Sequence, residues 1–134
     1  MISPAPHRVL LTYGIFDDMG PDCSARLRRL GALGRDVIVG CATDTFCRRS
    51  GLAVTTPYAL RRMRLERTRF VSHVIGQECW DQLRTDIVNY NVDVLALGDV
   101  PPGVDLSALR DIVHLVSLPW AAGEAGVEMT RRAS

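Results

Sequence analysis

A thiol and three carboxylates lie together where the sequence predicts the start of a helix. Cys23 follows Asp17, Asp18 and Asp22 in a segment that comes after a short apolar strand. A helix N-terminus favours a thiolate, whereas neighbouring carboxylates oppose it, so the two effects compete. If this segment is catalytic, we expect Cys23, Asp22 and Asp17 to carry the chemistry. Its acidic character would suit an amine, another cationic substrate or a divalent metal better than a triphosphate.

Arginine supplies every positive side chain that the sequence offers for binding an anion. All 16 basic residues are arginine, and none is lysine. Arg48 and Arg49 follow a predicted strand and Arg61 lies in a predicted helix, so each is a candidate for binding phosphate. The alternative is that they are solvated surface side chains. If a nucleotide is used, Asp17 or Asp99 could hold Mg²⁺.

The composition is that of an ordinary globular protein. At 134 residues the chain suits one domain, with residues 1–7 and the segment from about 121 to 134 expected to be loosely ordered. A net charge of +1 argues against nucleic acid or a membrane surface as a partner. The N-terminus does not have the pattern of a signal peptide, so we expect a cytoplasmic protein. The four cysteines and three histidines show no zinc-binding spacing, and we expect the thiols to be small buried hydrophobes.

Short apolar runs alternate with amphipathic segments along the chain, which is typical of an α/β fold. Strands are predicted at residues 8–13, 36–41, 71–75, 92–98 and 112–118, and helices at 22–33, 56–69 and 77–89. This order predicts a Rossmann-like, doubly wound, parallel five-stranded sheet. Ligands bind such sheets beyond the carboxyl ends of the strands. We therefore expect the site in the segments that follow the strands, at residues 14–23, 43–49, 76–80, 98–101 and from 119 onward.

Two of the helices carry more specific expectations. Thr56 is predicted to cap the helix at residues 56–69. On this helix we expect a solvated or ligand-facing side with Arg61, Arg62, Arg64 and Arg67. In the helix at residues 77–89, the predicted apolar stripe consists of Trp80, Leu83, Ile87 and Val88.

The segments at the strand ends match one family in order. They read TYGIFD at 12–17, ATDTF at 42–46, CWDQ at 79–82 and NVDV at 91–94, with Tyr58, Arg61, Gly98–Asp99 and Leu118–Pro119 in register. The chain thus resembles the glycerol-3-phosphate cytidylyltransferase family over residues 8–119. The resemblance implies the nucleotidylyltransferase type of fold, transfer of CMP from CTP to an alcohol phosphate with release of pyrophosphate, and a homodimer. It also implies that the ligand contacts Tyr13, Gly14, Phe16, Asp17, Arg48, Arg49, Arg61, Trp80, Gly98 and Asp99.

Three phosphate-binding elements of that family are altered in this sequence. Gly20 and Cys23 stand where the H-x-G-H motif has its histidines, and Asp22 stands in place of its glycine. The family's lysines fall within residues 50–53, and its R-T-x-G-x-S-T loop is replaced by WAAGEAG at 120–126. Such groups stabilise charge on a transferring phosphoryl group, so their loss predicts little ordinary cytidylyl transfer.

The sequence leaves three functional hypotheses open. The first is a non-catalytic family member that binds a small molecule, a nucleotide or a partner protein. The second is a repurposed enzyme that uses the altered pocket around Asp22 and Cys23. The third is a divergent, Mg²⁺-dependent nucleotidylyltransferase that uses CTP or ATP with an alcohol phosphate and relies on Arg48, Arg49 and Arg61.

Overall fold

The computed structural model describes residues 8–98 and 100–118, which form a single sheet of parallel strands. The strands are β1 (Val9–Gly14), β2 (Asp36–Ala42), β3 (His73–Gln77), β4 (Val94–Leu97) and β5 (His114–Ser117). Their spatial order is β3-β2-β1-β4-β5, with every neighbouring pair parallel. The predicted fold class is confirmed. Strand order reverses between β1 and β4, which is where a sheet of this type opens a crevice.

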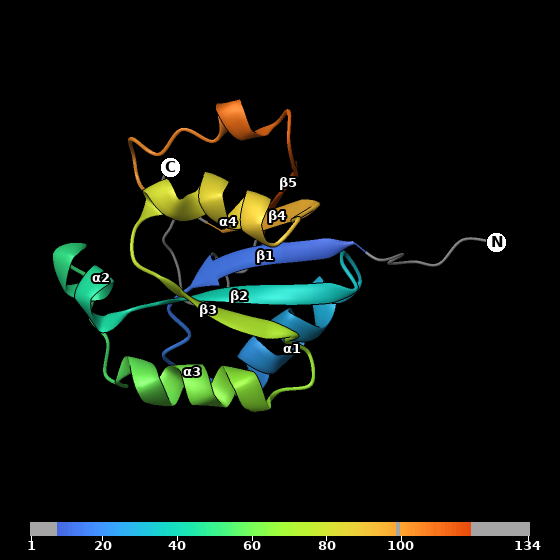
Figure 1. Cartoon of the computed structure of the whole chain (residues 1–134). Helices are drawn as coiled ribbons and strands as arrows, with labels where there is room; N and C mark the ends of the chain where they lie inside the picture. The colour runs from blue at the N-terminus through green and yellow to red at the C-terminus, as the bar shows by residue number, and fades with distance from the viewer. Residues whose placement is uncertain (1–7, 99, 119–134) are drawn as a thin grey trace.

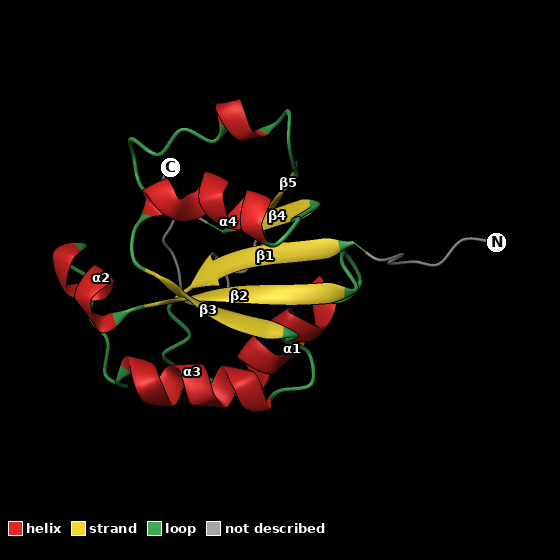
Figure 2. Ribbon diagram, viewed as in Figure 1, coloured by secondary structure: helices red, strands yellow, loops and turns green. Residues whose placement is uncertain are grey.

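Helices cover both faces of the sheet. The helices α1 (Pro21–Leu30) and α3 (Tyr58–Arg67) lie on one face, and α4 (Leu83–Asn89) lies on the other (Figure 1). The short helix α2 (Asp44–Arg49) follows β2 and lies beyond the end toward which the β1 arrow points (Figure 2). Two 3₁₀ turns complete the described elements, η1 (Trp80–Gln82) and η2 (Ser107–Leu109). The carboxyl edge of the sheet is therefore bordered by α2 and the turns that follow the strands.

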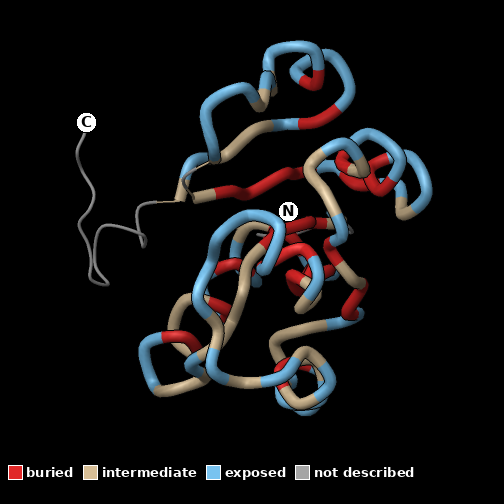
Figure 3. The backbone as a smooth tube through the Cα atoms, turned by 90° about the vertical axis from the view of Figure 1, so that its left-hand side faces the viewer, coloured by how far each residue is buried: buried red, intermediate tan, exposed pale blue. Residues whose placement is uncertain are grey.

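The core consists of one apolar cluster on each face of the sheet. Leu27 of α1 and Leu65 of α3 belong to the first cluster. Leu83 and Ile87 of α4 belong to the second. The strands β1, β2 and β4 between them are largely buried, and buried segments run through the middle of the tube coloured by burial (Figure 3). Burial on both faces explains why the strands read as continuous apolar runs rather than alternating ones.

Several predicted helix boundaries differ from those of the structure. The first helix ends at Leu30 rather than residue 33, because the N–H groups of Gly31, Ala32 and Leu33 bond three residues back in a tighter turn. Helix α3 begins at Tyr58 and is not capped by Thr56. Instead the Asp44 carboxylate accepts from the Tyr58 N–H at 3.1 and 3.0 Å, so a residue from another helix supplies the cap.

The region around α4 also differs from the prediction. Gln77 belongs to β3, and the helix begins only after the 3₁₀ turn at Trp80. Val88, predicted to lie on the apolar stripe, is 64% exposed, because Leu83 and Ile87 face the sheet and the next residue turns away from it. The helix α2 was not predicted at all. Strand β3 begins and ends two residues later than predicted, whereas β4 and β5 lie inside their predicted ranges.

Over the residues that the structure describes, no helix is both long and apolar enough to cross a membrane. The termini predicted to be loosely ordered, residues 1–7 and 121–134, lie outside the described part of the chain.

Candidate functional site

A cavity of about 990 Å³ lies at the carboxyl ends of the strands. Each of β1 to β4 contributes to its wall, as do α2 and the loop after β4. The lining residues are Tyr13, Gly14, Ile15, Arg26, Ala42, Phe46, Ser50, Leu52, Gln77, Trp80, Leu97, Gly98, Val100, Pro101, Pro102, Gly103 and Val104. The cavity thus lies at the strand ends, where the sequence predicts the site. Of the predicted ligand contacts, Tyr13, Gly14, Trp80 and Gly98 lie on this wall.

The end of β1 turns sharply beside the cavity. Phe16 has a positive φ of 56°, and its ring folds back over Gly14. A Cβ atom at Gly14 would lie 2.7 Å from that ring, so a larger residue at this position would require the ring to move. Phe16 packs against the core cluster on the α1 side and is not part of the cavity wall. Phe16, predicted as a ligand contact, therefore does not line this cavity.

A buried polar network fixes the back of the cavity. The Tyr13 hydroxyl donates to Asp86 Oδ2 at 2.5 Å, and Gln82 Nε2 donates to the same oxygen at 2.8 Å. Burial, together with the bond to Asp86, raises the pKa of Tyr13 well above its ordinary value. The Tyr13 phenol therefore stays protonated and acts as a structural donor. Sequence reasoning missed this network, although Gln82 and Asp86 have the i,i+4 spacing that brings helical side chains together.

The same network holds the turn that carries Trp80. Gln82 Oε1 accepts from the backbone N–H groups of Glu78 (2.6 Å) and Cys79 (3.1 Å). The ring of Trp80 then lies 5.6 Å from that of Tyr13, tilted by 58°. Trp80 also packs beside Phe46 in a small cluster. The indole is partly buried and lies on the cavity wall, where an aromatic ligand could pack against it.

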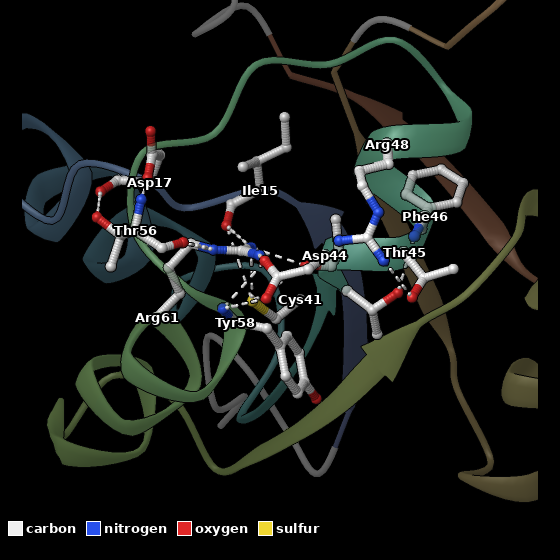
Figure 4. A network of polar contacts seen from close by, with 12 residues as sticks. Ile15, Asp17, Cys41, Asp44, Thr45, Phe46, Arg48, Thr56, Tyr58 and Arg61 are labelled. Atoms are coloured by element: carbon white, nitrogen blue, oxygen red, sulfur yellow. Dashed lines mark hydrogen bonds and ion pairs between the residues drawn. The ribbon is translucent and has the colours of Figure 1, made fainter.

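Arg61 is a buried structural residue, so the prediction that it lies on a solvated or ligand-facing side is wrong. Its side chain is fully buried, and Figure 4 shows it among the residues that it contacts. The guanidinium donates to the carbonyl oxygens of Thr56 (2.8 Å), Ile15 (2.8 Å) and Ala42 (2.7 Å). It also pairs with Asp44 Oδ1 at 2.8 Å. Because these partners use its donors, Arg61 joins the ends of β1, β2 and α3 rather than binding a phosphate.

Two carboxylates near the strand ends are likewise engaged with the backbone. Asp17 accepts from the N–H groups of Thr55 (3.0 Å) and Thr56 (2.8 Å), and these bonds, that of Thr55 first, lower its pKa to about 2. Asp44 has a lowered pKa because of the Tyr58 N–H and then Arg61. Asp17, predicted as a possible Mg²⁺ ligand or catalytic group, thus accepts hydrogen bonds from the loop before α3. The other candidate, Asp99, lies outside the described residues.

No metal-binding cluster of His, Cys, Asp or Glu occurs among the residues that the structure describes. Mg²⁺ therefore stays a prediction tied to the use of a nucleotide.

Arg48 and Arg49 lie in the last turn of α2. Arg48 Nη2 donates to Thr45 Oγ1 at 3.2 Å, and Arg49 donates to the Glu78 carbonyl. Both side chains are exposed, and neither lines the cavity.

The beginning of α1 does not open into the cavity. Gly20 is the N-cap without a side-chain hydrogen bond, and Asp22 is exposed in the first turn. Cys23 is only 4% exposed and belongs to the core cluster, with its Sγ 3.5 Å from Met19 Sδ. This burial counts against an exposed nucleophile at Cys23. The two described histidines are also remote, because His73 and His114 begin β3 and β5 at the opposite edge of the sheet.

Known proteins resemble this chain in sequence and in fold. Glycerol-3-phosphate cytidylyltransferase of Bacillus subtilis is 32% identical over 114 residues, which cover 85% of this chain and 88% of the relative. The Staphylococcus aureus protein of that name is 33% identical over 114 residues, with 85% and 86% covered. This chain belongs to the glycerol-3-phosphate cytidylyltransferase family. The resemblance stated from the strand-end motifs is confirmed.

Two further comparisons complete this result. A lipopolysaccharide core biosynthesis protein of Thermoplasma volcanium GSS1 superposes with a TM-score of 0.69 at 18% identity, over 83% of this chain and 95% of that protein. At this identity the likeness concerns the nucleotidylyltransferase type of fold. A scan against protein-family models found no match.

The described part of the cavity wall carries little charge. Among the described residues that line it, Arg26 is the one ionisable side chain other than the engaged Tyr13. Arg26 lies on α1, and its Nε donates to the Asp22 carbonyl at 3.4 Å. The remaining wall is apolar or neutral, with Gln77 and Ser50 as its other polar side chains.

Proposed function

We propose that the chain binds a small molecule or nucleotide in the strand-end cavity and does not catalyse ordinary cytidylyl transfer. The observation that carries this proposal is the low charge of the cavity wall, where Arg26 alone offers a cation among the described residues. A nucleoside triphosphate brings several negative charges, and its reaction depends on cations and donors placed around the transferring phosphoryl group. A wall of this kind favours binding over transfer.

The beginning of α1 gives independent support. The resemblance aligns the family's H-x-G-H motif with Gly20, Asp22 and Cys23. Glycine supplies no donor side chain there, the exposed Asp22 adds negative charge beside the helix N-terminus, and Cys23 is buried. The N–H groups of the first turn still attract anions, but the carboxylate competes for them. Removing one well-placed electrostatic group typically lowers a rate by about 10²–10³.

Pyrophosphate release is the direct test. The purified protein is incubated with Mg²⁺, glycerol 3-phosphate and either CTP or ATP, beside a working cytidylyltransferase as a positive control. We expect no release above background. Brisk, Mg²⁺-dependent release would overturn the proposal and favour the divergent enzyme, with the exposed Arg48 and Arg49 as the cations to mutate next.

Binding is tested separately by thermal shift with CTP, CMP and cytidine. A ligand at 100 times its dissociation constant should add about 2.7 kcal/mol to the free energy of unfolding. Trp80→Ala should reduce the shift, because it removes part of the cavity wall. Val88→Ala is the matched control, since Val88 is exposed on α4 and does not line the cavity.

Three further expectations stay predictions. These are a homodimer, association with a partner protein and a cytoplasmic location. Light scattering on the purified protein would measure the first.

A further inference from the structure

A second hollow, of about 590 Å³, lies on the surface where the end of α3 meets the segment that leads into α1. These two helices cover the same face of the sheet (Figure 1). The lining residues of this surface hollow are Asp18, Met19, Gly20, Ser24, Arg64, Arg67 and Thr68. None of them lines the strand-end cavity. A ligand in the surface hollow would therefore be one that the proposed function does not include.

Two arginines supply the positive charge of the surface hollow. Arg64 and Arg67 are exposed in the last turn of α3, at the i,i+3 spacing that places two side chains on one face of a helix. In the part of the chain that the structure describes, neither guanidinium has a hydrogen bond or an ion pair. Arg61 and Arg62 of the same helix, by contrast, donate within the fold. Because neighbouring like charges repel, an anion held by Arg64 and Arg67 would stabilise the pair.

Two hydroxyl groups add neutral donors to the same wall. Ser24, in the first turns of α1, has no side-chain hydrogen bond to any described residue. Thr68 Oγ1 accepts from the Phe70 N–H at 3.3 Å, and its own proton has no acceptor among the described residues. A hydroxyl can donate and accept at once, so both groups can still donate to a ligand.

Asp18 is the one acidic side chain among the lining residues. Its Oδ1 accepts from the Gly20 N–H at 3.1 Å, and the carboxylate pairs with neither Arg64 nor Arg67. Two guanidinium groups against one carboxylate leave an excess of positive charge. A ligand that is negatively charged and rich in acceptor oxygens matches this set of donors, whereas a cation or an apolar group does not.

We propose that the surface hollow binds a phosphate group, with Arg64 and Arg67 donating to its oxygens and the hydroxyls of Ser24 and Thr68 donating beside them. The planar fork of arginine matches the geometry of phosphate, whose oxygens can accept from several donors together. The phosphate group belongs either to a small soluble compound or to a lipid headgroup, and both sources present this chemistry.

Inorganic phosphate is the first probe. It is titrated into the ¹⁵N-labelled protein, with chloride at the same ionic strength as the reference, and NMR follows the side-chain Nε–Hε signals. We expect the signals of Arg64 and Arg67 to shift and to saturate. Arg64→Met and Arg67→Met should each raise the dissociation constant by roughly tenfold, the effect of losing one hydrogen bond to a charged group.

Two further variants separate this site from a general effect of charge. Arg29→Met removes an exposed arginine from the last turn of α1 that does not line the hollow, and we expect wild-type binding. Asp18→Asn removes the negative charge but keeps an oxygen that can accept from the Gly20 N–H. We expect it to tighten phosphate binding by about threefold, as for one charge in a solvated site. Loss of the fold could not tighten binding.

Vesicles identify the source of the phosphate group. Sedimentation with phosphatidylcholine vesicles that contain phosphatidic acid is compared with sedimentation with phosphatidylcholine alone. Retention on the first kind, reduced in Arg64→Met and Arg67→Met but kept in Arg29→Met, supports a lipid headgroup. Saturable binding of inorganic phosphate without retention supports a small soluble compound.

Two results would overturn the inference. One is a wild-type protein that binds neither inorganic phosphate nor the vesicles with phosphatidic acid. The other is binding that Arg64→Met and Arg67→Met keep, or that Arg29→Met weakens as much, since general positive charge would then account for it. The proposed function has separate readouts, because pyrophosphate release and the nucleotide thermal shift report on the strand-end cavity.

Discussion

Replacing Arg61 by methionine should destabilise the whole fold, because Arg61 joins three segments from inside the protein. Its guanidinium bonds to the carbonyl oxygens of Ile15, Ala42 and Thr56 at 2.7–2.8 Å. These carbonyl groups lie at the carboxyl ends of β1 and β2 and just before α3. Methionine is also unbranched near the backbone, but it is shorter and has no donor, so the three carbonyls lose their partner at the edge of the core.

The size of the effect follows from these bonds. A hydrogen bond to a charged group contributes about 1.5–3 kcal/mol, but the contributions are not additive and water can reach some of the freed carbonyls. The ion pair with Asp44 adds little, since that carboxylate side chain is 43% exposed. We therefore expect Arg61→Met to cost about 3–5 kcal/mol, the range for breaking a buried charged network. A domain has only about 5–15 kcal/mol of stability in total.

Urea unfolding followed by far-ultraviolet circular dichroism measures this cost. Arg64→Met is the matched control, because Arg64 lies on the same helix with an exposed side chain and should change the free energy by less than about 0.5 kcal/mol. Arg61→Lys should fall between the two, since one ammonium cannot reach all three carbonyls. An Arg61→Met protein within about 1 kcal/mol of the wild type would refute this reasoning.

Two other predictions concern ionisable groups. Asp17 has a folded pKa of about 2, below the usual value of about 3.9 for a free aspartate, so its contribution to stability is present above pH 4 and lost as the pH falls toward 2. The stability difference between wild type and Asp17→Asn, measured by urea unfolding, should therefore shrink from pH 7 to pH 2.5, and a constant difference would contradict the assigned bonds. In iodoacetamide labelling read by mass spectrometry, the partly exposed Cys79 should react first, while Cys23, Cys41 and Cys47 are protected until unfolding; burial also raises the pKa of Cys41 to about 11. Labelling of Cys23 as fast as Cys79 would instead support the repurposed-enzyme hypothesis.

The sheet and the place of the cavity were predictable from the sequence, because both depend on local patterns. Continuous apolar runs such as residues 36–42 indicate strands buried on both faces, and parallel strands place their carboxyl ends at one edge. The segments expected to hold the site do meet there, with Tyr13, Trp80 and Gly98 on one cavity wall. Periodicity and connectivity are enough for this level of description.

The roles of individual polar residues were not predictable in the same way. Arg61, Arg62 and Arg64 look alike in sequence, yet Arg61 alone of the three is fully buried. What distinguishes it is the position of carbonyl groups at the ends of β1 and β2, which only the packed structure defines. Asp86 was missed for a related reason: its partner Tyr13 lies 73 residues away. The six residues of α2 are too few for a helical period to be recognised.

Hydrogen bonds made within the fold hold the segments that border the cavity. Arg61 fixes the ends of β1 and β2, Asp17 fixes the loop before α3, and Asp86 fixes Tyr13. Each makes these bonds to groups that lie outside the beginning of α1. Under the proposed function, replacement of the H-x-G-H motif would then remove transfer chemistry without collapsing the binding site. Ligand binding and catalysis can be lost separately in such an arrangement, and Trp80→Ala should weaken binding in a protein whose fold is intact.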